Sequence, residues 1–463
     1  MEPLSLIQIA GTCAGTLLGG PPGALITQVI TDSRLAAPGC LFVAIKGERL
    51  DGHDYIAEAV RGGVTAVMVE ESRPASIAFP CATVAVASTR RALGDMAAFH
   101  RSRFAIPAIA VGGSNGKTTT KELLRAVLSQ GLVTLASEAS FNNDIGVPLT
   151  LFKLESAHQA AVLEVGTNHP GEMAPLLRLI RPRYGVLTSL GREHLEFFGT
   201  VEGVIEEEGW LAEVLPADGA LFVDGGSHGI ERVLSRARSR VVRVGWTPRD
   251  DWQALRACVD GGGTTLLARG PRDDLSGEYH MRLLGRHQVT NALLALAVGA
   301  ELGLTRGQLQ RGLAACPPPR MRLQLHEWHG VRVLDDSYNA NADSMRAAIE
   351  TMCDVADSGR SIAVLGDMAE LGDQSRAAHA EVGEFAALMG IEHLFAVGSM
   401  ASLLCGAARA AGMGDAREFA DAESAATAVK NFVRPGDLVL VKASRATRLE
   451  RVVERLEQDM PHT

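Results

Sequence analysis

Residues 110–120 read Ala-Val-Gly-Gly-Ser-Asn-Gly-Lys-Thr-Thr-Thr, and this glycine-rich stretch decides how the chain around it folds. The mostly apolar run 106–111 suits a buried parallel strand, and apolar residues recur at helical spacing over 123–128. A strand, a glycine-rich turn and a helix in this order are typical of a loop that binds phosphate groups. The strict pattern of such loops has glycine where this chain has Val111, but the flanking strand and helix favour phosphate binding over a purely structural turn.

This loop carries the groups that a triphosphate needs. Small residues let backbone N–H groups turn toward phosphate oxygens, and the helix N-terminus adds a partial positive charge. Lys117 supplies a mobile cation, and the hydroxyl of Thr118 is suited to Mg²⁺. We therefore expect triphosphate contacts from Gly113, Ser114, Asn115, Gly116, Lys117, Thr118 and Thr119.

The composition excludes several classes of protein. The formal net charge is -9, and Lys and Arg are dispersed without a dense basic block, which argues against nucleic-acid binding. The seven cysteines form no Cys-x-x-Cys pair, so neither a metal cluster nor a disulfide framework is expected. No apolar run reaches the length of about 18 residues that a membrane span needs. We expect a cytoplasmic, monomeric, multidomain enzyme with small-molecule partners and no membrane insertion.

Apolar runs and linkers divide the chain into three α/β segments, predicted at 1–105, 106–316 and 317–463. The third begins after Cys316 with three prolines, which form a stiff linker. Strand-like runs alternate there with helical patterns, which predicts a Rossmann-like domain. A hairpin is expected around 261–263 in the second segment. The predicted strands are 26–30, 40–44, 66–69 and 83–86 in the first segment, 106–111, 160–165 and 184–188 in the second, and 331–334, 362–365, 394–397 and 438–441 in the third.

Acidic and imidazole side chains follow the next two predicted strands of the middle segment. Glu164 stands at a strand end, where a carboxylate can complete a Mg²⁺ shell with Thr118; a surface glutamate is the alternative. His194 follows the run 184–188, although a histidine taken alone is more often structural. The acidic run 206–208 is, by itself, typical of a solvated helix face.

Two further polar segments are candidates for nucleotide contacts. Asn142 and Asn143 lie in a rigid polar loop that leads into a helix, although asparagine-rich loops are usually turns. Residues 285–292 open a helix rich in alanine and leucine, which can bring Asn291 to the edge of an adenine. Read alone, this segment is an ordinary capped helix start.

The order of these segments and motifs resembles the Mur ligase family, whose members use ATP to add amino acids to the cytoplasmic peptidoglycan precursor. The resemblance covers nearly the whole chain. Residues 31–34 and 46–54 are similar to the family's uridine-nucleotide-binding domain, and residues 335–341 and 365–372 to the member that adds D-alanyl-D-alanine. The resemblance implies an α/β, three-domain Mur ligase architecture, with a central P-loop ATPase-like domain and a C-terminal Rossmann-like domain that binds the incoming dipeptide.

The resemblance also implies catalytic and metal-binding roles in the middle domain. Lys117, Glu164 and His194 would be the catalytic residues. Thr118 and Glu164 would hold one Mg²⁺, and His194 with Glu208 would hold a second.

Several positions depart from the family pattern, among them Ala139-Ser140 in place of Gly-Asn, Ala342 in place of proline and Ala443 in place of glycine, and the sharpest departure is Glu208. At the position of Glu208 the family has a lysine that becomes carbamylated, so Glu208 would present its own carboxylate instead. Gly112 replaces the usual threonine, and Ser189 replaces an asparagine.

Further ligand contacts carried over from the resemblance come from all three domains. Asn143 would contact ATP or the metal, and Asn291 would contact the adenine. Asp336 and Asn339 would contact the ribose and phosphates. Arg322 would lie near the phosphates, and Arg320 is close enough in the sequence to be the alternative. For the substrates they are Ser33, Arg34 and His53 at the uridine diphosphate, and Lys442, Ser444 and Arg445 at a carboxylate. The alternative for Ser33, Arg34 and His53 is a turn with surface charge. The alternative for Lys442, Ser444 and Arg445 is a solvated loop.

The activity implied by the resemblance is ATP-dependent amide-bond formation in peptidoglycan synthesis, and hence in cell wall biogenesis, cell shape and cell division. UDP-N-acetylmuramoyl-tripeptide would be phosphorylated on its carboxylate, and D-alanyl-D-alanine would attack the acyl phosphate. One alternative is a related ligase that adds diaminopimelate or lysine, but the arginine-centred acceptor motif expected of it is absent. The other is a non-catalytic regulator, which the substitution at Glu208 motivates.

Overall fold

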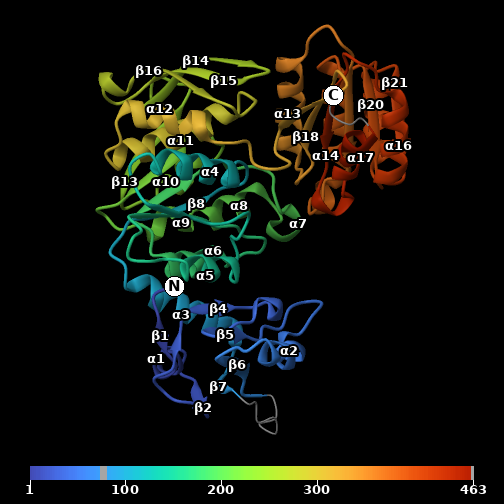
Figure 1. The fold of residues 1–463 in the computed structure, drawn as a ribbon. Helices are drawn as coiled ribbons and strands as arrows, with labels where there is room; N and C mark the ends of the chain where they lie inside the picture. Colours follow the sequence, from blue (N-terminus) through green and yellow to red (C-terminus); the bar gives the residue numbers. More distant parts are fainter. Residues whose placement is uncertain (73–80, 460–463) are drawn as a thin grey trace.

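The computed structural model describes residues 1–72 and 81–459, which form three α/β regions with a separate sheet in each (Figure 1). The N-terminal region, drawn in blue, lies below the middle region, and the C-terminal region, drawn in orange and red, lies beside it. The predicted three-part α/β fold class is therefore confirmed. The domain boundaries at 105 and 316 stay predictions.

The N-terminal region is built on a five-stranded sheet with the order β2-β7-β6-β5-β4. Strands β4 to β7 run parallel, and β2 is antiparallel to β7. A small antiparallel pair, β1 and β3, lies beside it. The elements are β1 (Leu4–Ser5), α1 (Leu6–Thr12), β2 (Thr16–Leu18), β3 (Leu25–Ile26), β4 (Gln28–Ile30), η1 (Ser33–Leu35), β5 (Cys40–Val43), η2 (Gly52–Tyr55), α2 (Ile56–Arg61), β6 (Ala66–Glu70), β7 (Ala82–Val86) and α3 (Thr89–Ser102).

The middle region is a nine-stranded sheet with the order β16-β15-β14-β13-β12-β11-β8-β10-β9. Its strands are parallel from β9 to β14, and β14 to β16 form an antiparallel meander. The elements are β8 (Ala108–Gly112), α4 (Lys117–Leu128), β9 (Thr134–Ala136), α5 (Gly146–Leu151), β10 (Ala160–Glu164), α6 (Met173–Ile180), β11 (Tyr184–Leu187), α7 (Leu195–Phe198), α8 (Val201–Glu208), α9 (Trp210–Val214), β12 (Ala220–Asp224), α10 (Ile230–Leu234), β13 (Arg240–Gly245), β14 (Trp252–Asp260), β15 (Gly263–Arg269), η3 (Asp273–Leu275), β16 (Gly277–Met281), α11 (Gln288–Glu301) and α12 (Arg306–Ala315).

Strand β8 is buried on both faces, which explains its continuous run of apolar residues. Ala108 and Ala110 point into a core shared with α5, α6 and α9, whereas Ile109 and Val111 point into a core shared with α4 and α11. The sheet is therefore covered by helices on both sides, and the loop after β8 emerges at the carboxyl edge of its parallel part. Ligands bind at this edge in open α/β sheets.

The C-terminal region is a six-stranded sheet with the order β17-β18-β22-β19-β20-β21, parallel except for β17. The four strands predicted in this segment are confirmed as β18, β19, β20 and β22. The elements are β17 (Gln324–Trp328), β18 (Val331–Asp336), α13 (Ala342–Val355), β19 (Ser361–Gly366), η4 (Gly372–Gln374), α14 (Ser375–Leu388), β20 (His393–Val397), α15 (Ala401–Ala410), β21 (Asp415–Phe419), α16 (Ala422–Phe432), β22 (Leu438–Lys442), η5 (Arg445–Thr447) and α17 (Glu450–Asp459).

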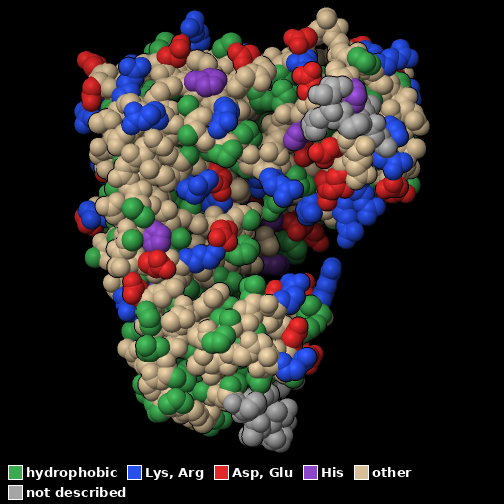
Figure 2. All heavy atoms as spheres, in the orientation of Figure 1, with side chains coloured by type: hydrophobic (Ala, Val, Ile, Leu, Met, Phe, Trp, Pro, Cys, Tyr) green, Lys and Arg blue, Asp and Glu red, His purple; other side chains and the backbone are tan. Residues whose placement is uncertain are grey.

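The three regions are joined differently to one another. Helix α3 packs against both α1 and the helices α5 and α6, so the N-terminal and middle regions share one hydrophobic core. Between the N-terminal and C-terminal regions the space-filling surface is hollowed (Figure 2). Within the described residues, no helix has the length and apolar character needed to cross a membrane.

Candidate active site

A cavity of about 680 Å³ lies where the middle and C-terminal regions meet. The phosphate-binding loop, the ends of β10 and β11 and the start of α11 line it from one side, and the loop after β18 lines it from the other. Its predicted site residues are Ser114, Asn115, Gly116, Lys117, Thr118, Thr119, Glu164, His194, Asn291, Arg322, Asp336, Asn339 and Lys442. The cavity therefore brings together most of the residues predicted for ATP.

The phosphate-binding loop has the predicted strand–loop–helix geometry, with β8 ending at Gly112 and α4 beginning at Lys117. Gly113 and Gly116 have φ angles of +111° and +89°, which side chains rarely tolerate. A Cβ at Gly116 would lie 2.5 Å from Asn291 Oδ1, so a side chain at this position would also displace Asn291 of α11.

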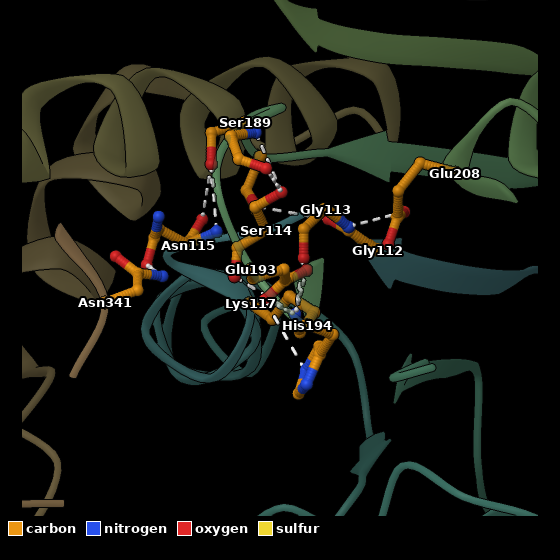
Figure 3. A network of polar contacts seen from close by, with 12 residues as sticks. Gly112, Gly113, Ser114, Asn115, Lys117, Ser189, Glu193, His194, Glu208 and Asn341 are labelled. Atoms are coloured by element: carbon orange, nitrogen blue, oxygen red, sulfur yellow. Dashed lines mark hydrogen bonds and ion pairs between the residues drawn. The ribbon is translucent and has the colours of Figure 1, made fainter. Parts of the chain in front are cut away.

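Lys117 is held inside the loop by protein oxygens (Figure 3). Its Nζ donates to the carbonyl oxygens of Gly113 (2.5 Å) and Ser114 (3.1 Å) and lies 3.3 Å from both carboxylate oxygens of Glu193. Burial alone would lower the pKa of Lys117, but the carboxylates of Glu193, Glu208 and Glu164 outweigh burial and raise it. Lys117 is therefore a cation at neutral pH, positioned to attract an anion.

Glu164 ends strand β10 and is only 1 % exposed. Its Oε1 accepts a hydrogen bond from Asn142 Nδ2 at 3.0 Å, whereas its buried Oε2 has no hydrogen-bond partner among the described residues. A buried carboxylate oxygen without a partner costs free energy. A cation bound at Oε2 would remove that cost, so the surroundings of Glu164 fit a Mg²⁺ ligand.

The nearby Thr118 hydroxyl has a protein partner. Thr118 Oγ1 accepts a hydrogen bond from Arg322 Nη2 at 3.2 Å, and the Arg322 guanidinium lies 4.4 Å from the ring centre of Tyr338. Arg322 lines the cavity and Arg320 does not, which favours Arg322 as the arginine near the phosphates.

His194 precedes helix α7 with a left-handed φ of +50°. Its Nδ1 lies 2.5 Å from Glu370 Oε2 of the C-terminal region, and this hydrogen bond is the main cause that lowers the pKa of Glu370. A carboxylate can only accept, so Nδ1 carries the proton. The Nε2 of a neutral His194 is then left with its lone pair, the form that binds metals.

The three carboxylates of Glu206–Glu208 have different partners in the structure. Glu206 is exposed and pairs with Arg232 of α10 and with Arg236 just after it. Glu207 is buried and accepts the backbone N–H groups of Gly171 (2.8 Å) and Met173 (2.7 Å) at the start of α6. Glu208 is buried and accepts the N–H of Gly113 at 2.7 Å. The interpretation of the run as a solvated face holds only for Glu206.

Glu193 is a site residue that the sequence analysis passed over. It lies in the segment between β11 and α7, lines the cavity and contacts Lys117. Burial raises the pKa of Glu193, and the charges of Lys117 and His194 oppose that effect. Its position after a buried strand and directly before His194 could have identified it as a candidate site residue.

The predicted C-terminal ATP residues form one polar cluster at the cavity. Lys442 Nζ donates to Asp336 Oδ2 at 2.6 Å and to the carbonyl oxygen of Asn339 at 2.9 Å. Tyr338 crosses to the middle region, where its hydroxyl donates to Ser140 Oγ at 2.9 Å.

Several predicted residues already use their polar atoms on the protein. Asn291 accepts a hydrogen bond from Thr120 and donates one to Gln288. Asn143 accepts the N–H of Gly146 at the start of α5, and its neighbour Asn142 lines the cavity. Ser444 is buried and bonds Asp367 and Ala369, and Arg445 pairs with Glu450. Ser33 donates to Glu58, Arg34 pairs with Asp32, and His53 contacts Asp51 and accepts from the N–H of Glu70. Asn143, Ser444, Arg445, Ser33, Arg34 and His53 do not line the cavity, and their ligand contacts stay predictions.

Comparison with known families covers most of the chain in three consecutive matches. Residues 25–101 match the Mur ligase family catalytic domain, residues 111–299 the Mur ligase middle domain, and residues 320–445 the Mur ligase glutamate ligase domain.

Individual proteins are similar over nearly the full length. The UDP-N-acetylmuramoyl-tripeptide–D-alanyl-D-alanine ligase of Escherichia coli (strain K12) is 36% identical over 99% of both chains, and that of Bacillus subtilis (strain 168) is 33% identical over 93% of both. The crystal structure of MurF from Acinetobacter baumannii superposes with a TM-score of 0.91 at 30% identity, covering 99% of both chains. MurF ligase from Thermotoga maritima in complex with ADP superposes with a TM-score of 0.81 at 27% identity, covering 94% of this chain and 97% of that one. The chain therefore belongs to the Mur ligase family.

Proposed function

We propose that this chain is an ATP-dependent ligase that joins D-alanyl-D-alanine to UDP-N-acetylmuramoyl-tripeptide and releases ADP and phosphate. The observation that carries the proposal is the cavity in which the phosphate-binding loop, Glu164 and the polar cluster around Lys442 meet. The full-length similarity to dipeptide ligases supports this choice of substrates. Both substrates and ATP belong to the cytoplasm, so we infer a cytoplasmic enzyme of peptidoglycan synthesis, acting as a monomer.

The chemistry explains why ATP is needed. A carboxylate and an amine do not form an amide readily near pH 7, because the carboxylate carbon is a poor electrophile. Transfer of the γ-phosphoryl group to the tripeptide carboxylate gives an acyl phosphate and ADP. The dipeptide amine then attacks the acyl carbon, and the tetrahedral intermediate expels phosphate. Holding the reactants in place contributes on the order of 7–11 kcal/mol in the best intramolecular cases.

The residues of the loop would stabilise charge during this transfer. Lys117 is cationic and lies among backbone carbonyls that a phosphate group can replace as partners. Arg322 reaches the loop from the linker before β17 and adds a second positive charge. Preorganised charges of this kind are usually the largest single contribution to such catalysis.

Mg²⁺ is the metal that fits the residues present. Glu164 offers a buried oxygen without a protein partner, and Thr118 lies on the same cavity. No three His, Cys, Asp or Glu side chains within 1–72 and 81–459 are gathered as a metal site. Mg²⁺ commonly uses one or two protein ligands together with water and phosphate oxygens. Mg²⁺ would neutralise charge on the phosphates. His194 lines the cavity and Glu208 does not, so a second ion held by both residues stays a prediction.

The substrate contacts complete the proposal. Of the three residues predicted to bind a substrate carboxylate, Lys442 lines the cavity, and we assign it to that carboxylate. Ser33, Arg34 and His53 lie in the N-terminal region, and we assign them to the uridine diphosphate.

Phosphate release by the purified chain tests this proposal. The assay contains ATP, Mg²⁺, UDP-N-acetylmuramoyl-tripeptide and D-alanyl-D-alanine, each omitted in turn, and the product is weighed by mass spectrometry. We expect release only with all four, and a product heavier by the dipeptide less water. Release with lysine or diaminopimelate in place of the dipeptide would identify another ligase of the family. ATP binding without release under any combination would indicate a regulator.

A further inference from the structure

Glu208, predicted above as a metal ligand, contacts the backbone of the phosphate-binding loop (Figure 3). Its Oε2 accepts the N–H of Gly113 at 2.7 Å, and the residue is 2 % exposed. Burial raises the pKa of Glu208 to about 8, while the Lys117 cation acts in the opposite direction. Because burying such a group is costly, its contact with the loop needs an explanation.

The residue before Gly113 leaves the space that this carboxylate occupies. A Cβ built at Gly112 would lie 2.8 Å from Glu208 Oε2, closer than real Cβ atoms approach any neighbour. Side-chain atoms of Leu211 and Met173 lie 3.5 Å from the built Cβ, an ordinary contact distance, so only the carboxylate would clash with it. Gly112 is not among the glycines with positive φ, so its backbone would accept a side chain. The need for glycine at position 112 therefore comes from Glu208.

Gly113 is held from two sides as a result. Glu208 binds its N–H, and Lys117 binds its carbonyl oxygen at 2.5 Å. Its φ of +111° lies in the region that only glycine adopts readily. Two side chains thus fix the backbone turn at which the chain leaves β8 and enters the loop.

We propose that Gly112 and Glu208 form a matched pair that positions the phosphate-binding loop for ATP. Glu208 acts through the loop backbone, so it is a positioning residue. Gly112 has no side chain and therefore leaves room for the Glu208 carboxylate. The pair accounts for two departures from the family pattern with one contact. The inference rests on the proposed function only in naming ATP as the ligand of the loop.

A double-mutant cycle tests the pair through the affinity for ATP, measured by calorimetry with Mg²⁺ present. Gly112→Ala places a methyl group against the carboxylate and displaces it, and Glu208→Asp withdraws the carboxylate by one methylene. Each change breaks the same hydrogen bond, so each is expected to weaken ATP binding about tenfold. The double variant is also expected to lose about tenfold, because the shorter side chain leaves room for the methyl group.

Two outcomes would overturn the pairing. One is an ATP affinity of Gly112→Ala equal to that of the unchanged protein. The other is a loss of about a hundredfold in the double variant, the product expected of independent effects. Gly261→Ala is the matched control, because a Cβ there meets nothing within 4 Å, and it should leave ATP affinity unchanged.

Hydrogen exchange at the Gly113 amide keeps this test separate from the proposed function. Exchange should be faster in Gly112→Ala and in Glu208→Asp than in the unchanged protein, without ATP and at equal melting temperature. Unchanged exchange would contradict the pair even if the ligase assay succeeds. Faster exchange would support it even if the chain ligates a different amine.

Discussion

At the scale of single residues, Glu164 gives the strongest reason to expect a cation. Its carboxylate is buried, one oxygen is satisfied by Asn142, and the other has no hydrogen-bond partner among the described residues. Asn142 orients the group, and Ser137 holds its backbone N–H at 3.1 Å. The side chain is therefore fixed in place before any ligand enters.

Replacing this carboxylate by an amide should remove catalysis while preserving the fold. Glu164→Gln keeps the shape and an oxygen for Asn142 but removes the negative charge. We expect kcat to fall about 100- to 1000-fold, the range seen when one charge-stabilising group is lost. Phosphate release measured over a series of Mg²⁺ concentrations checks the prediction. Exposed Glu155→Gln is the control, and a Glu164→Gln enzyme with normal Mg²⁺ dependence would refute the metal role.

At the scale of structural elements, the segment between β11 and α7 holds the phosphate-binding loop in place. Ser189 uses both its backbone and its side chain for this: its carbonyl oxygen accepts the N–H of Ser114 at 2.8 Å, and its Oγ exchanges two hydrogen bonds with the backbone of Asn115. Gly191 adds a bond from its N–H to Ser114 Oγ at 2.9 Å. The conformation of one loop therefore depends on the other.

Ser189→Ala should loosen this contact without breaking it. The variant loses two hydrogen bonds, each contributing about 0.5–1.5 kcal/mol, and keeps the backbone bond to Ser114. We expect KM for ATP to rise about tenfold and kcat to stay within about threefold. Steady-state kinetics with varied ATP checks this. The control is Ser235→Ala, whose hydroxyl donates to the carbonyl oxygen of Arg232 in the preceding helix, α10. Equal KM values for the two variants would contradict the prediction.

At the scale of the whole molecule, the same segment joins the middle and C-terminal regions. Arg192 donates to Asp343 at 2.8 Å and to Glu381 at 2.7 Å, both on helices of the C-terminal region. The hydrogen bond from Arg192 lowers the pKa of Glu381, so the pair stays charged through neutral pH. His194 contacts Glu370 of the same region. Glu193, between the two, faces Lys117 instead. The position of the C-terminal region is thus tied to the loop that carries Lys117.

Removing Arg192 should loosen the contact between the middle and C-terminal regions. The effect on KM should therefore be larger for D-alanyl-D-alanine than for ATP. Arg192→Ala is expected to raise KM for D-alanyl-D-alanine about five- to tenfold, with a smaller change for ATP. The pair is partly exposed, so its coupling energy with Glu381→Ala should be only about 0.5–1 kcal/mol. Kinetics of both single variants and the double variant measure it, and small-angle scattering should show a larger radius of gyration.

The control for this cycle is Arg409→Ala, whose partner Glu418 lies in the same region as Arg409 itself. It should change neither the kinetics nor the scattering. Additive effects of Arg192→Ala and Glu381→Ala, with unchanged dimensions, would show that the bridge does not position the C-terminal region.

Most strands that are buried on both faces could be predicted from the sequence, although β12 is equally apolar and buried and was missed. Continuous apolar runs correctly indicated β8, β10, β11, β19, β20 and β22, because such runs suit only the middle of a covered sheet. The hairpin around 261–263 is also confirmed, since Asp260 pairs with Gly263. Partly exposed strands such as β17 and β21 carry no such run and were missed.

The predicted strand 26–30 shows how tertiary contacts override a local pattern. In the structure it breaks at Thr27 into β3, which pairs with β1, and β4, which pairs with β5. Both pieces are apolar and strand-like, so the residues themselves give no sign of the break. The partner strands decide it.

The sequence by itself determined the elements whose cause is local: the glycine-rich loop, the strands and helices beside it, and the residue types that suit ATP. The tertiary structure alone decided which side chains meet. Glu206, Glu207 and Glu208 look alike in the sequence, yet they face solvent, helix α6 and the phosphate-binding loop. The reason is physical: a side chain's partner across many residues depends on strand order and helix packing, and neither is written in the spacing of neighbouring residues.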